Sequence, residues 1–119
     1  MKRILVIEDN ETNMYLCTRI LTNSGYEVIP AASGGEGIET MKKEKPDLIL
    51  MDIQLPDMDG LEATKRIRES EEGKEVPIIA LTSYAMTGDR EKAFSAGCTG
   101  YIEKPINPET FIAEIEKYL

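Results

Sequence analysis

Four predicted strands of the sequence each lead into polar side chains that could bind a cation or a phosphoryl group. These side chains belong to Glu8, Asp9, Asp52, Thr82 and Lys104. Three acids, a hydroxyl and an ammonium group provide what phosphoryl transfer requires: an attacking carboxylate, ligands for a cation, and positive charge at the phosphoryl oxygens. We predict that Asp52 is the acceptor and forms an acyl phosphate, because its carboxylate ends a buried run and leads into a turn.

Carboxylates that converge at one place repel one another, so a divalent cation among them is stabilising. Mg²⁺ prefers octahedral oxygen ligands, keeps several waters and bridges carboxylate to phosphate. We predict that Asp9 and Asp52 bind Mg²⁺ directly, that Mn²⁺ can substitute for it, and that the backbone carbonyl of Gln54 is a third ligand. Glu8 is expected to act through a water molecule or from behind the direct ligands.

The other two run ends offer positive charge and hydrogen-bond donors to the phosphoryl oxygens. Lys104 can reach them as a mobile point charge, and the Thr82 hydroxyl and the Ser83 backbone amide can donate to them. We expect Pro105 to fix the turn that aims the lysine, with a cis peptide bond as one way to do so. Gly60 is interpreted as a structural turn residue with a positive φ.

Each of these residues alone also has a purely structural explanation. The acid pair after the first run could be a solvated turn, and Asp52 could cap a helix. Thr82 could be a satisfied strand-end hydroxyl, Lys104 a solvent-exposed lysine, and Tyr101 a residue at the rim of the core. The combination is far more specific than its members, because all of them fall at the ends of predicted strands.

Strands and helices must alternate to position these residues. The β-rich runs lie near 3–7, 26–30, 47–52, 77–82 and 100–102. The stretches between them are long enough for helices, which we predict between the first two strands and near 33–44, 60–70, 87–97 and from 107 onward. Asn10 or Thr12 could cap the first helix, Gly25 could end it, and Asn107 with Pro108 opens the last.

Five strand–helix units predict an α/β fold: a doubly wound, five-stranded parallel sheet with five helices. The run 26–30 carries a charge and ends in proline, which suits an edge strand. The sheet order is then 2-1-3-4-5, the flavodoxin-like arrangement. Ligands of such sheets bind beyond the carboxyl ends of the strands, where the strand order reverses. Glu8, Asp9 and Asp52 are expected to converge there.

The length and charge of the chain restrict its class. Its 119 residues fit one domain, so we expect a single domain, 1–119, with no effector domain. A net charge of −8 argues against nucleic acid or an anionic membrane as the main partner. Neither a signal peptide nor an apolar run of membrane-spanning length is present, so we expect a cytoplasmic protein.

Residue types that are scarce in the chain restrict the chemistry. The sequence contains no histidine, which excludes catalytic pairs and metal sites built on that residue. Oxygen ligands remain, and they favour Mg²⁺ or Ca²⁺ over Zn²⁺. Cys17 and Cys98 form no C-x-x-C motif and are expected to be core or near-core thiols.

These motifs resemble the receiver domains of two-component response regulators, and the resemblance covers essentially the whole chain. The matching residues are Glu8-Asp9-Asn10, Asp52 with Pro56 and Gly60, Thr82-Ser83, and Tyr101 with Lys104-Pro105. The resemblance implies that a sensor histidine kinase or a histidine phosphotransfer protein donates the phosphoryl group. It implies a phosphoacceptor regulator that assists its own Mg²⁺-dependent phosphorylation and dephosphorylation, not an enzyme acting on other substrates. Many members carry aspartate where this chain has Glu8, but glutamate also occurs there.

The resemblance also implies a switch. In such a switch, Thr82 would move toward the bound phosphoryl group and Tyr101 would swing inward behind it, which would remodel the surface formed by residues 84–105 and the last helix. An output protein would bind that surface. By the same resemblance, Gln54 and Tyr84 are expected to flank the attacking water and to tune the phosphoryl lifetime.

Two stretches, 45–56 and 84–89, are similar to single-domain members that control cell division and polarity. Asn13 completes an Asp-Asn-x-x-Asn pattern that is frequent in stand-alone and hybrid-kinase receivers. Within the family, an alternative role is a phosphorelay shuttle that passes the phosphoryl group to another histidine protein.

Two alternatives from other classes have less support. A Mg²⁺-dependent phosphatase of the haloacid dehalogenase type needs a second aspartate two residues after the nucleophile, where this chain has Gln54. A flavin-binding flavodoxin needs a phosphate loop rich in Ser, Thr and Gly after the first strand, and the sequence has none there.

Overall fold

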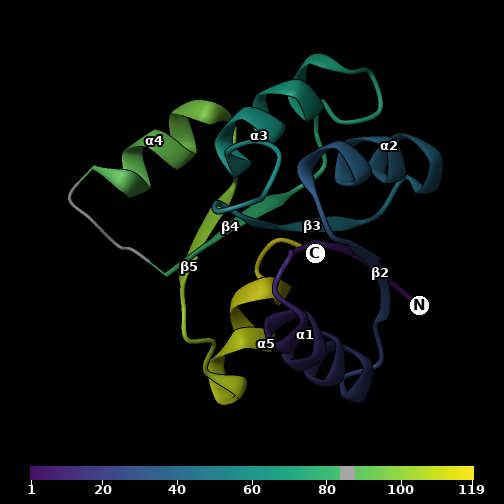
Figure 1. The fold of residues 1–119 in the computed structure, drawn as a ribbon. Coiled ribbons are helices and arrows are strands. Elements are labelled where there is room, and N and C mark those ends of the chain that lie inside the picture. Colours follow the sequence, from purple (N-terminus) through teal and green to yellow (C-terminus); the bar gives the residue numbers. More distant parts are fainter. Residues whose placement is uncertain (84–87) are drawn as a thin grey trace.

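Strands and helices alternate along the computed structural model, which describes residues 1–83 and 88–119 (Figure 1). The strands are β1 (Arg3–Ile7), β2 (Glu27–Ala31), β3 (Leu48–Asp52), β4 (Ile78–Thr82) and β5 (Gly100–Glu103). The helices are α1 (Glu11–Asn23), α2 (Gly34–Glu44), α3 (Gly60–Glu69), α4 (Asp89–Ala96) and α5 (Pro108–Glu116). The predicted elements are therefore confirmed, with shifts of only a few residues at their ends.

The strands form one parallel sheet in the order β2-β1-β3-β4-β5. β2 lies at an edge, as its charge and its proline predicted. β3 and β4 are buried along their whole length, because helices cover both faces of the sheet. The strand order reverses between β1 and β3, so a ligand site is expected beyond the carboxyl ends of these two strands.

Two apolar cores lie on opposite faces of the sheet. Figure 1 shows α2, α3 and α4 on one face and α1 and α5 on the other. Successive residues of each strand alternate between the cores: Leu5 faces the α2–α4 side, while Ile4 and Val6 face the α1–α5 side. This alternation fixes which side chains can meet at the strand ends.

Local signals in the sequence set the ends of the helices. Asn10 caps α1, where its side-chain oxygen accepts a hydrogen bond from the Asn13 amide at 2.9 Å. α1 ends before Gly25, whose φ of +91° stops the helix. Asn107 caps α5 in front of Pro108 in the same way. Of the two caps predicted for α1, the structure uses Asn10.

Both cysteines are buried thiols, as predicted. Burial raises the pKa of Cys17 to about 12 and also raises that of Cys98. Among the described residues, no helix combines the length and the apolar character that crossing a membrane requires.

Arg68 joins the end of α3 to two other segments. Its Nε donates to the Gly97 carbonyl at 2.9 Å, and its Nη1 donates to the carbonyls of Gly73 and Val76 at 2.9 and 2.6 Å. Its Nη2 reaches the Thr99 hydroxyl at 3.2 Å. Burial lowers the pKa of this guanidinium. One side chain thus holds the α3–β4 and α4–β5 connections together.

We expect Arg68→Met to lower the free energy of unfolding by about 2 kcal/mol, because three carbonyls lose a charged donor. Urea denaturation of the two proteins measures the difference. Arg66→Met is the matched control: Arg66 is exposed and, within residues 1–83 and 88–119, forms an ion pair with Glu62 alone, so its loss should cost at most about 0.5 kcal/mol. Equal losses in both variants would show that Arg68 does not hold these connections.

Candidate functional site

Strand alternation brings three charged side chains together at the carboxyl edge of the sheet. Glu8 and Asp52 continue the positions of β1 and β3 that face α1 and α5. Lys104 does the same after β5, whose Ile102 packs on that face. The three residues lie far apart in the sequence and meet because parallel strands end at one edge.

Lys104 lies between the two acids. Its Nζ is 2.6 Å from Glu8 Oε1 and 3.4 Å from Asp52 Oδ1. Glu8 and Asp52 are only 2% and 4% exposed, so these charges compensate one another away from bulk water. Backbone amides orient both acids: Asn10 donates to Glu8 Oε2 at 3.2 Å, and Gln54 donates to Asp52 Oδ1 at 3.1 Å.

The electrostatics of this group follow from its crowding. Burial, together with the hydrogen bond and negative charge of Glu8, raises the pKa of Asp52 to about 7. Burial alone would lower the pKa of Lys104, but its hydrogen bonds and attraction to the two acids raise it. The carboxylate whose pKa is raised is therefore that of the predicted acceptor.

The residues of this edge suit a hard divalent cation. Carboxylate oxygens of Glu8, Asp9 and Asp52 lie within 4.8 Å of one another. One lysine among three acids leaves a net negative charge that Mg²⁺ would neutralise. Glu8 Oε1 already binds the lysine, whereas Asp9 is exposed. This arrangement supports direct ligation by Asp9 and Asp52, with Glu8 behind them.

An open pocket of about 290 Å³ holds most of the predicted site. It is lined by Glu8, Asp9, Asn10, Asn13, Asp52, Gln54, Ser83 and Lys104. Lys104 precedes Pro105 through a cis peptide bond, the form that the sequence had suggested.

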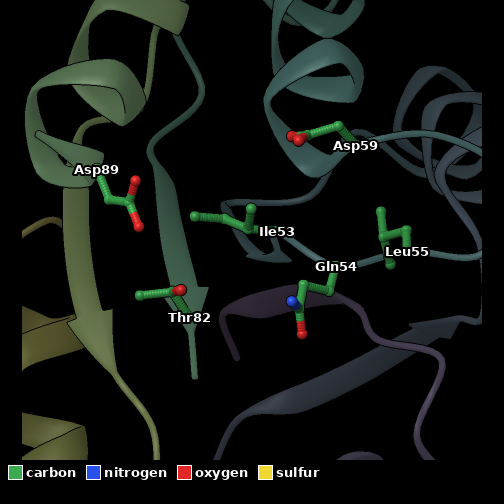
Figure 2. Close-up of a pocket in the computed structure, with 6 residues that line it drawn as sticks. All are labelled: Ile53, Gln54, Leu55, Asp59, Thr82 and Asp89. Carbon is green, nitrogen blue, oxygen red and sulfur yellow. The ribbon is translucent and has the colours of Figure 1, made fainter. Parts of the chain in front are cut away.

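Thr82 does not line this pocket, because the residue ends β4 on the opposite side of the sheet. It lines a second pocket of about 430 Å³ on the α3–α4 side, together with residues of the β3–α3 loop and Asp89 of α4. Figure 2 shows Thr82 and Asp89 on one side of this pocket and Leu55 and Asp59 on the other. Gln54 lines both pockets, so it lies at the boundary between them.

Tyr101 belongs to the same side as Thr82. It packs against the α2–α4 core. Burial and the charges of Asp89 and Glu103 raise the pKa of Tyr101, while a hydrogen bond with Thr82 acts in the opposite direction and lowers it. The two predicted switch residues therefore lie together on the α2–α4 side of the sheet. Their movement after phosphorylation stays a prediction, and Tyr84 with the rest of 84–87 lies outside the described residues.

The interpretation of Gly60 as a positive-φ residue is wrong. Among the described glycines, positive φ occurs at Gly25, Gly88 and Gly97, whereas Gly60 begins α3. A Cβ at Gly60 would lie 2.2 Å from the Asp52 carbonyl oxygen. Glycine is needed here because the helix starts directly against the strand that carries the acceptor.

Sequence reasoning missed Asp57, whose carboxylate binds the amides of Gly34 and Gly35 from a different loop. Two consecutive glycines at a helix start leave amides accessible, and an acid in a neighbouring loop is a suitable acceptor. The glycine pair therefore indicates that an acceptor is needed at the start of α2, but the sequence does not show that the loop carrying Asp57 lies beside it.

Comparison with known proteins gives a consistent result. The family model described as response regulator receiver domain matches residues 4–116. The polar-differentiation response regulator DivK of Brucella ovis is 47% identical over 118 residues, covering 99% of this chain and 96% of that protein.

Two solved structures are similar over almost the whole chain. The chemotaxis protein CheY4 of Vibrio cholerae has a TM-score of 0.95 and 31% identity, covering 100% of this chain and 99% of its own. The receiver domain of sensor histidine kinase PA1611 from Pseudomonas aeruginosa has a TM-score of 0.92 and 38% identity, covering 98% and 96%. That domain was crystallised with Mg²⁺ coordinated in its active-site cleft.

Proposed function

This chain belongs to the response regulator receiver domain family, and we propose that it acts in two-component signalling by accepting a phosphoryl group on Asp52. One observation carries the proposal: a buried carboxylate at the switch point of the sheet, held beside an ammonium group and two further acids. Family membership also favours this function over the phosphatase and flavin-binding alternatives.

The donor is a phosphohistidine on a partner protein, because this chain has no histidine. An Asp52 carboxylate oxygen attacks the phosphorus, the phosphorus–nitrogen bond breaks, and the leaving imidazole takes up a proton. Lys104 starts 3.4 Å from the attacking carboxylate and can follow the charge onto the phosphoryl oxygens. Glu8 holds this ammonium group in place before transfer. The partner is a sensor histidine kinase or a histidine phosphotransfer protein.

Asp9, Asp52 and the Gln54 carbonyl are the residues that would hold Mg²⁺, and Mn²⁺ is expected to substitute. The bound cation would neutralise charge between carboxylate and phosphoryl oxygens. The acidic cluster of this chain and the Mg²⁺ in the similar domain of PA1611 both support this assignment.

The output is a change in protein binding, and the protein is a regulator that assists its own phosphorylation and dephosphorylation. Thr82 and Tyr101 are hydrogen-bonded neighbours beside α4, so a movement of the Thr82 hydroxyl toward the phosphoryl group would change the position of the tyrosine. We propose that this pair alters the surface of α4, β5 and α5, where an output protein binds. Similarity to DivK supports a DivK-like role for this chain.

The proposal is tested with acetyl phosphate as a small donor. Incubation with Mg²⁺ should add one phosphoryl group, seen by mass spectrometry of the intact protein, and hydroxylamine should release it as expected for an acyl phosphate. A chelator should suppress the adduct, because three crowded acids repel an incoming phosphoryl anion without a cation. A stable adduct that forms equally well with chelator, or that maps outside 47–56, would contradict the assignment.

A further inference from the structure

The loop that follows the acceptor strand, residues 53–59, is fixed to the site at both of its ends. At its start, the Gln54 amide donates to Asp52 Oδ1 at 3.1 Å. At its end, the Gly60 amide donates to the Ile53 carbonyl at 2.7 Å, and Gln54 forms a bridge with Asp59. The geometry of this loop therefore determines where the Gln54 carbonyl points.

The tip of the same loop is tied to a different segment. Asp57 Oδ1 accepts a hydrogen bond from the Gly34 amide at 2.8 Å, and Asp57 Oδ2 accepts one from the Gly35 amide at 2.9 Å. These two bonds lower the pKa of Asp57. The Met58 side chain packs directly against Gly34: a Cβ added at Gly34 would lie only 2.6 Å from the Met58 Cγ atom. A bidentate carboxylate and a packed side chain thus connect the loop to the start of α2.

Capping of α2 does not by itself explain this contact. The helix has its own N-cap in Ser33, whose hydroxyl accepts from the Glu36 amide at 3.2 Å. Asp57 accepts hydrogen bonds from the Gly34 and Gly35 amides, which Ser33 does not bind, although Asp57 lies 23 residues after Gly34 in the sequence. The contact therefore restrains two loops relative to each other, which a local cap does not.

We propose that Asp57 is a positioning residue for the metal site. Its carboxylate holds the 53–59 loop against α2 so that the Gln54 carbonyl faces the acidic cluster. The inference rests on the proposed function, in which that carbonyl is a Mg²⁺ ligand. Asp57 is exposed and lies outside the pocket of the acceptor, so it acts only through the loop.

Mg²⁺ titration of the unphosphorylated protein, followed by amide resonances in NMR spectra, tests the inference without relying on phosphorylation. Asp57→Ala should weaken Mg²⁺ binding about 10-fold, the lower end of the range for residues that support metal ligands. Asp57→Asn keeps one oxygen acceptor and should lose less. Ser33→Ala is the matched control: it weakens the start of α2 by a cap of similar kind, leaves the loop contact in place, and should keep wild-type affinity.

The outcomes separate this inference from the proposed function. Equal Mg²⁺ affinities for wild type, Asp57→Ala and Ser33→Ala would overturn the role of Asp57 and leave the metal site intact. Equal weakening in Asp57→Ala and Ser33→Ala would also overturn it, because helix-end stability would then be the cause. If Asp9→Asn binds Mg²⁺ as well as wild type does, the metal site itself is wrongly assigned and the inference falls with it.

Discussion

Asp52→Asn is expected to lose phosphorylation completely and, at the same time, to be more stable than the wild-type protein. The carboxamide cannot attack phosphorus as the carboxylate does, so no adduct should form with acetyl phosphate and Mg²⁺. Intact mass spectrometry measures this result directly. A persistent adduct at full yield would mean that another residue is the acceptor.

The gain in stability has a separate physical cause. Asp52 is 4% exposed and lies beside Glu8, and its raised pKa means that this environment disfavours the charged carboxylate at neutral pH. Removing that charge should raise the free energy of unfolding by about 1–2 kcal/mol, after allowance for the lost attraction to Lys104 and for partial screening by solvent.

Urea denaturation at neutral pH without divalent cations measures this difference. Glu39→Gln on the exposed side of α2 is the control for a change in net charge, and it should keep both adduct formation and wild-type stability. A less stable Asp52→Asn protein would show that attraction to the lysine outweighs repulsion between the acids. The expected pattern is that of a site in which function is maintained at a cost in stability.

Gly60→Ala is expected to destabilise the protein by on the order of 3 kcal/mol. The new Cβ would lie 2.2 Å from the Asp52 carbonyl oxygen and 2.7 Å from the Ile53 Cα. Both neighbours are backbone atoms, so relief requires α3 to move away from β3. Movement of that backbone would also disturb the acceptor, so the remaining folded protein should be phosphorylated more slowly.

Thermal and urea denaturation measure the loss, and Gly25→Ala provides the matched control. Gly25 has a positive φ, but no atom lies within 4 Å of the position that an alanine Cβ would take, so alanine there should cost only about 1 kcal/mol. Similar losses at the two positions would show that the backbone beside Gly60 yields easily, and would contradict close approach as the reason for glycine.

The fold could be predicted from the sequence because its signals are local and repeated. Short apolar runs alternate with helical spacing, and the charge and proline of the run 26–30 mark the edge strand. From that order alone, the convergence of Glu8, Asp52 and Lys104 follows, since parallel strands end at one edge.

Other features depend on details that the sequence pattern does not contain. Strand alternation places Thr82 and Asp52 in different pockets, but this could be predicted only if the exact residue at which each strand ends were known. The contact of Asp57 with α2 depends on how two loops approach each other. The need for glycine at position 60 depends on the distance between a helix start and a strand, which no local preference encodes.

The burial of both native thiols makes the chain suitable for site-specific labelling. Cys17 and Cys98 are shielded, and their raised pKa values leave little reactive thiolate at neutral pH. A cysteine introduced at the partly exposed Phe94 of α4 would then be the preferred point of attachment for a dye. Such a dye would stand on the side of the sheet away from the acceptor, where fluorescence could follow signalling in real time without occupying the chemical site.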